Sequence, residues 1–172
     1  MNLRRADEAP LVIGHRGALC DAPENSAERL AAAVAVGADV VEFDVSHGLV
    51  VAHSPEEQAP GALTLDETLE LLAPSGIGLH VDVKYAGYEA EVVAAVRRHG
   101  VAERTYFSSA LPASMRVLGE LAPDISRAIG YPRDRYGLSR LHWPAMVTRT
   151  GASAARAAMP VRVPLLLRRS RA

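Results

Sequence analysis

The stretch Val40-Val41-Glu42-Phe43-Asp44-Val45 decides the fold, because it places two carboxylates inside an otherwise apolar strand. Side chains alternate between the two faces of a strand, so Glu42 and Asp44 share one face. Strands of a parallel sheet are normally apolar on both faces, and charges inside such a strand need a reason. The stretch therefore predicts a buried strand whose carboxyl end carries a functional site.

Further side chains with metal or phosphate chemistry end other apolar segments. They are His15 and Arg16 after 11–14, His53 at the end of 49–53, and Asp82 and Lys84 at the end of 79–84. In a closed parallel barrel the active site gathers at the carboxyl ends of the strands. We therefore expect these groups to converge. His80, deeper in its strand, is expected to pack rather than to react.

Strands and helices alternate along the chain. The predicted strands are 11–14, 40–45, 49–53, 79–84, 105–108 and 126–131, with 49–53 forming a hairpin with 40–45. Helices are expected to begin after Asn25 and Thr64, each followed three residues later by the Glu of a capping box, and at Glu89 and Pro112. This order predicts an α/β fold of the (β/α)8 barrel type. The strands are too few for eight, so the barrel is expected to be incomplete.

Composition suits one globular domain. The chain has 172 residues, 49% of them hydrophobic, and a net charge of −1, which gives no electrostatic reason to expect a nucleic acid partner. We expect a single domain over 1–172 in which 132–172 form a tail of unassigned structure. The sequence contains no apolar segment long enough for a signal peptide or membrane span, so the expected location is the cytoplasm.

The carboxylates permit two interpretations. Glu42, Asp44 and Asp82 either form an interior salt-bridge network with Lys84, the one lysine of the chain, or hold a divalent cation. Clustered carboxylates repel one another, and hard divalent cations prefer oxygen ligands. Arg16 is the residue type that pairs with phosphate through two parallel hydrogen bonds. The set as a whole indicates metal-assisted chemistry on a phosphate.

These residues resemble the glycerophosphodiester phosphodiesterase family. The resemblance is carried by Gly14-His15-Arg16-Gly17, Pro23-Glu24-Asn25-Ser26, the stretch from Gly37 to Val45, Val51-Ala52-His53 and Val81-Asp82-Val83-Lys84. It implies a barrel that hydrolyses glycerophosphodiesters, as small-molecule substrates, to glycerol 3-phosphate and an alcohol with Ca²⁺ or Mg²⁺. By matching position it implies His15 and His53 as the acid/base pair, Arg16 and Lys84 as phosphate ligands, and Glu42, Asp44 and Asp82 as metal ligands.

The chain departs from the family pattern at two places in this set. The family often has Glu where this chain has Asp82, and the aspartate that usually follows the second histidine is Ser54. Two alternatives stay open. In the first, the chain is an inactive remnant of such a barrel and associates with itself through open sheet edges. In the second, it is a related phosphodiesterase that acts on lysophospholipids.

Overall fold

The computed structural model describes residues 11–58 and 60–130. The chain divides into two units, 1–132 and 133–172, and the described residues all belong to the first. The predicted tail over 132–172 lies outside the described residues, and the prediction of one domain over the whole chain stays a prediction.

One parallel sheet forms the centre of the described part. Its strands are β1 (Ile13–His15), β2 (Val40–Val45), β3 (Gly78–Val83), β4 (Thr105–Ser109) and β5 (Ser126–Ile129). All neighbours pair in parallel, and the order in the sheet is the order in the sequence. A doubly wound sheet reverses its strand order at one point, whereas a barrel sheet does not. The arrangement is therefore the predicted α/β fold, an incomplete barrel.

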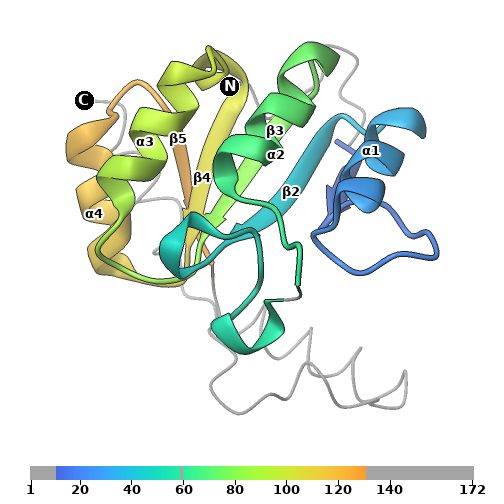
Figure 1. Cartoon of the computed structure of the whole chain (residues 1–172). Coiled ribbons are helices and arrows are strands. Elements are labelled where there is room, and N and C mark those ends of the chain that lie inside the picture. Colours follow the sequence, from blue (N-terminus) through green and yellow to red (C-terminus); the bar gives the residue numbers. More distant parts are fainter. Residues whose placement is uncertain (1–10, 59, 131–172) are drawn as a thin grey trace, which may run out of the picture. The chain divides into compact units, whose positions relative to one another are not determined.

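Four helices connect the strands and contact one another in sequence order. They are α1 (Ala27–Ala35), α2 (Leu65–Leu72), α3 (Glu89–Arg98) and α4 (Pro112–Leu121). In Figure 1, α2 and α3 lie in front of β3 and β4. The capping box of α2 is present, with Thr64 accepting from the Glu67 N–H and Glu67 accepting from the Thr64 N–H. The prediction that Asn25 caps α1 is wrong, because Ser26 accepts the capping hydrogen bond from Arg29.

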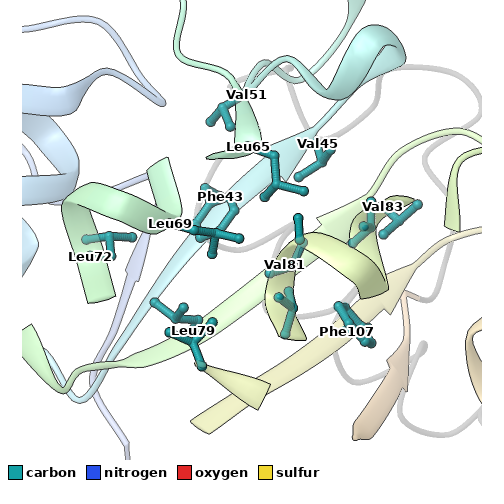
Figure 2. Packing of buried hydrophobic residues seen from close by; sticks show 14 of the residues in the cluster. Phe43, Val45, Val51, Leu65, Leu69, Leu72, Leu79, Val81, Val83 and Phe107 are labelled. Carbon is teal, nitrogen blue, oxygen red and sulfur yellow. The ribbon is translucent and has the colours of Figure 1, made fainter. Parts of the chain in front are cut away.

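The hydrophobic core lies between the helices and one face of the sheet. Phe43 and Phe107 are fully buried there, with Leu69 of α2 and with Val81 at the middle of β3 (Figure 2). A buried side chain of this size contributes about 1.5–3 kcal/mol to folding. Because these residues fill one face of each strand, the alternate residues must face the other way, toward the interior side of the barrel.

That second face carries a row of polar side chains. The register sets Glu42 opposite His80, and it sets Asp44 opposite Asp82, which in turn is opposite Ser108. Glu42 and Asp44 thus lie on one face of the sheet, as predicted. Parallel pairing then aligns the polar residues of β2, β3 and β4 across neighbouring strands.

The predicted strand over 49–53 is wrong. The chain leaves β2 through a 3₁₀ turn, η1 (His47–Leu49), in which Gly48 and Leu49 both have positive φ, 71° and 57°. Only isolated antiparallel bridges follow, Val45 with Val51 and Val50 with Thr64. Two successive residues in the left-handed region turn the chain too sharply for a ladder to continue. His53 is consequently held by a loop and not by a strand end.

Candidate active site

Three carboxylates meet where β2 and β3 end. Glu42, Asp44 and Asp82 each offer an oxygen, and these oxygens lie within 4.8 Å of one another. Glu42 and Asp44 are buried, whereas Asp82 is half-buried. The structure therefore brings together the three acidic residues for which the sequence predicted a metal-binding role.

Each carboxylate receives a hydrogen bond from an element other than its own strand. The backbone N–H of Arg16 donates to Glu42 Oε2 at 2.8 Å, and Asn25 Nδ2 donates to Asp44 Oδ2 at 3.0 Å. Ser108 Oγ donates to Asp82 Oδ1 at 2.5 Å. The β1–α1 loop and β4 thus fix the orientation of acids that belong to β2 and β3.

Lys84 lies between two of the acids. Its Nζ is 2.7 Å from Asp44 Oδ1 and 2.5 Å from Asp82 Oδ2. Burial by itself lowers the pKa of Lys84, but the charges of Asp82 and Asp44 outweigh burial, and the pKa rises above the ordinary lysine value. An ammonium group has three donors, so one remains for a third partner.

Arg16 connects the carboxylates to a histidine. Its Nε is 2.9 Å from Asp44 Oδ2, its Nη1 donates to Glu24 Oε2 at 2.6 Å, and its Nη2 is 2.6 Å from His53 Nδ1. The hydrogen bond from Arg16 lowers the pKa of Glu24 against the effect of burial. Arg16 itself has a positive φ of 52°, a conformation that is uncommon for a residue with a side chain and that turns the chain just after β1.

His53 has two partners at the same ring nitrogen. Nδ1 lies 2.6 Å from Arg16 Nη2 and 3.3 Å from Asp44 Oδ2. A guanidinium only donates, so Nδ1 accepts here, and the network assigns the proton of the neutral ring to Nε2. The residue after His53 provides no orienting carboxylate, since Ser54 stands where the family usually has an aspartate. Asp44 lies next to the ring instead.

The other two histidines of this region differ in exposure. His15 is at the rim, with 71% of its side chain exposed and Nε2 3.8 Å from Glu42 Oε2. His80 stacks on Tyr106, with ring centroids 4.2 Å apart, and is hydrogen-bonded to Ser108. Burial lowers the pKa of His80 to about 4 despite the charge of nearby Asp82. His80 packs, as predicted.

The chemistry of the donor set fits a divalent cation. Burial, followed by the charge of Asp44, raises the pKa of Glu42 to about 8, so ionising both acids together is costly. Burial also raises the pKa of Asp44, but Lys84 and Asn25 outweigh it and the pKa is lowered. Asp44 Oδ1 has no hydrogen-bond partner among the described residues, although it pairs with the charge of Lys84. A hard cation among these oxygens would relieve the repulsion.

Three residues with a role in this geometry were missed as site residues. Glu24 and Asn25 lie in a quoted motif, but Asn25 was interpreted as a helix cap, whereas both ends of its amide bind Asp44. Ser108 belongs to none of the quoted motifs. Its position opposite Asp82 in a parallel sheet is the signal that would have identified it.

The segment that carries the site in this incomplete α/β barrel is similar to one known protein family. A sequence profile described as "Glycerophosphoryl diester phosphodiesterase family" matches residues 15–54, the segment that contains His15, Arg16, Glu42, Asp44 and His53. No curated protein matches the chain. The predicted resemblance to this family is thus shown in its motif segment, and solved structures extend it to the fold.

Several solved structures superpose on the chain. A glycerophosphodiester phosphodiesterase from Parabacteroides distasonis is 22% identical with a TM-score of 0.60, over 69% of this chain and 64% of that one. The enzyme from Agrobacterium tumefaciens is 28% identical with a TM-score of 0.58, over 68% and 64%. An Oleispira antarctica phosphodiesterase, solved with its product sn-glycerol-3-phosphate, is 23% identical with a TM-score of 0.59, over 76% and 70%. The chain therefore spans 64% of the length of the first two.

Among the described residues, no helix has the length and apolar character needed to cross a membrane.

Proposed function

We propose that the chain hydrolyses glycerophosphodiesters to glycerol 3-phosphate and an alcohol with the help of a divalent cation, Ca²⁺ or Mg²⁺. The observation that carries the proposal is the cluster of Glu42, Asp44 and Asp82 within 4.8 Å of one another, next to the contact of Arg16 with His53. The family profile that matches 15–54 and the Oleispira antarctica structure with sn-glycerol-3-phosphate support the same substrate class.

Arg16 and Lys84 are the proposed phosphate ligands. Arg16 Nη1 donates one hydrogen to Glu24 and Nη2 donates one to His53, so each Nη keeps a second N–H, while Nε pairs with the charge of Asp44 without a hydrogen bond. Lys84 keeps one of its three donors. Both cations can therefore bind phosphate oxygens without first releasing the carboxylates that position them. Their charges oppose the repulsion between a phosphodiester anion and a nucleophile.

Glu42, Asp44 and Asp82 are the proposed cation ligands. When bound, the cation supplies positive charge that stabilises the phosphoryl oxygens as the transition state forms. The two oxygens of Asp44 have different neighbours, because Oδ2 faces Arg16, Asn25 and His53 while Oδ1 faces the Lys84 ammonium. The same residue thereby couples the cation site to the histidine.

His53 is the proposed proton acceptor. A phosphate oxygen that binds Arg16 Nη2 competes with His53 for its N–H while Arg16 stays on Asp44 and Glu24. Once the hydrogen bond to His53 is lost, Nδ1 of His53 is free to carry a proton and donate it to Asp44 Oδ2, 3.3 Å away. Nε2 then bears the lone pair that accepts the proton of the attacking hydroxyl, from the glycerol or from water. Asp44 holds the ring in this tautomer.

His15 is the proposed proton donor to the leaving alcohol. Its side chain is 71% exposed at the rim, with Nε2 3.8 Å from Glu42 Oε2, so the ring can reach a leaving group that faces solvent. Opposite roles for the two histidines let one proton leave the nucleophile while another reaches the leaving group. Each such transfer contributes typically 10²–10⁴-fold to the rate.

The test is turnover of glycerophosphocholine with Ca²⁺ or Mg²⁺, followed by release of glycerol 3-phosphate, with a chelator as control. We expect His15→Ala to lower kcat by about 10²–10⁴-fold. The matched control is His99→Ala, which removes an imidazole bonded to Asp66 and not to the site. A lysophospholipid assayed beside glycerophosphocholine tests the alternative substrate. Full activity of the parent in chelator, or of His15→Ala, would contradict the mechanism.

A remnant that acts only by binding is the second candidate, and one observation favours it. In the described part β1 and β5 each pair with a single strand, and Ile13 and Ile129 on these edges are 43% and 47% exposed. Open edges invite pairing with a second copy. Size-exclusion chromatography tests this: a monomer that turns over substrate argues against the remnant, and an inactive oligomer supports it.

The cytoplasmic location stays a prediction for imaging to test.

A further inference from the structure

Asp82, the third carboxylate of the cluster, has a hydrogen-bond partner on the neighbouring strand. Ser108 follows Phe107 on β4 and is opposite Asp82 in the register. Its Oγ lies 2.5 Å from Asp82 Oδ1 and 2.7 Å from His80 Nε2. His80, Ser108 and Asp82 therefore form a chain of hydrogen bonds that ends on an oxygen of the candidate cation site.

The direction of this chain follows from counting protons. An ionised carboxylate only accepts hydrogen bonds, so the Ser108 hydroxyl must donate its single proton to Asp82. Its oxygen can then only accept from His80, and the Nε2 proton that it accepts is present in the neutral Nε2–H tautomer and in the imidazolium alike. The order is thus His80 to Ser108 to Asp82 in both charge states of the ring.

The ring at the start of the chain is held in place. His80 stacks on Tyr106, at 4.2 Å between centroids and with 21° between the ring planes, and Tyr106 is buried. Two residues after His80 along β3, Asp82 is more exposed than its partners, with 20% of its side chain accessible against none for Asp44. Of the three acids it is the one with most freedom to rotate, and Lys84 contacts only its Oδ2.

We propose that Ser108, oriented by the Nε2–H of His80, is a positioning residue that fixes the Asp82 carboxylate toward the cation held with Glu42 and Asp44. The inference rests on the proposed function, since it deepens that site. Asn25 does the corresponding work for Asp44, and the Arg16 N–H does it for Glu42, so Ser108 completes the set. Partners of this kind typically change metal affinity by 10–100-fold when they are removed.

The experiment measures binding of the cation alone, without substrate. Ca²⁺ affinity is obtained by calorimetry, and Tb³⁺ luminescence reports the ligands around the ion. We expect Ser108→Ala to weaken Ca²⁺ binding by about 10–100-fold, and Ser108→Thr, which keeps the hydroxyl, to restore it. His80→Phe keeps an aromatic ring for the stack and removes the donor, and it should weaken binding in the same direction but less.

The matched control lies one residue away. Ser109→Ala also removes a buried hydroxyl from β4, but that hydroxyl donates to the Val83 carbonyl and not to Asp82. It should leave Ca²⁺ affinity within about twofold, as expected for a change outside the site. A parent that binds neither Ca²⁺ nor Tb³⁺ overturns the metal part of the proposed function and this inference together. A parent that binds, with Ser108→Ala or His80→Phe binding as tightly, overturns this inference alone.

Discussion

At the scale of single residues, Asp44 connects the parts of the site, because its carboxylate faces Arg16, His53 and Lys84 from three separate segments of the chain. The sequence predicted that the acids, Arg16 and His53 would converge, because charged groups at the ends of apolar strands need a reason, and the structure brings them together. It misplaced Asn25, since an Asn before a helix has the same pattern whether it caps the helix or reaches 19 positions along the chain to Asp44. Long-range side-chain partners depend on register and loop path, which local patterns do not contain.

Arg16 offers the sharpest test at this scale. Its three nitrogens contact Asp44, Glu24 and His53, and a lysine offers a point charge without the planar fork. We expect Arg16→Lys to lower kcat/KM for glycerophosphocholine by about tenfold or more, which corresponds to roughly 1.4 kcal/mol, and to weaken glycerol 3-phosphate binding measured by calorimetry. Arg97→Lys, on the surface pair with Asp124, is the control and should be neutral. Equal kcat/KM values for the parent and the Arg16→Lys variant would show that the planar guanidinium of Arg16 is not needed for the reaction.

At the scale of elements, the helices and buried strands were predicted well because their signals are local. The capping box of α2 and the proline at the start of α4 fixed both starts, and the apolar alternation fixed β2. The segment 49–53 was mistaken for a strand because its apolar run contains the β-formers Val50 and Val51. What decides it is the backbone at Gly48 and Leu49, and a positive φ at a leucine has no sequence signature.

The α2 cap is testable by itself, because α2 supplies Leu65, Leu69 and Leu72 to the core. We expect Thr64→Ala to lower the free energy of unfolding by about 0.5–2 kcal/mol, since the Glu67 N–H loses its acceptor. Thr64→Ser keeps the oxygen and should stay near the parent. Urea unfolding followed by circular dichroism measures both. If the alanine variant unfolds at the same urea midpoint as the parent, the cap contributes nothing to α2.

At the scale of the whole molecule, the site and the fold are linked through buried charge. Burial and the charge of Asp44 raise the pKa of Glu42 from its ordinary 4.5 to about 8. A carboxyl whose pKa is higher in the folded state binds more protons when folded, so the folded state loses stability as pH rises from about 4.5 to 8. Buried Glu42 therefore lowers the stability of the folded state as the pH rises. A bound cation would offset this loss, because it favours the ionised form of Glu42.

This link predicts how stability depends on pH and metal together. In chelator, the free energy of unfolding of the parent should fall between pH 5 and 8 relative to Glu42→Gln, by an amount on the order of a few kcal/mol. Saturating Ca²⁺ should remove most of that difference in the parent, since a ligand at 100 times its Kd stabilises by about 2.7 kcal/mol. Ca²⁺ should leave the Glu42→Gln variant less affected. Thermal unfolding at each pH, with and without Ca²⁺, measures all four combinations. Parallel pH profiles for the parent and the variant in chelator would show that Glu42 is ionised in the folded protein at no cost, and the need for a cation at this site would then lose its physical basis.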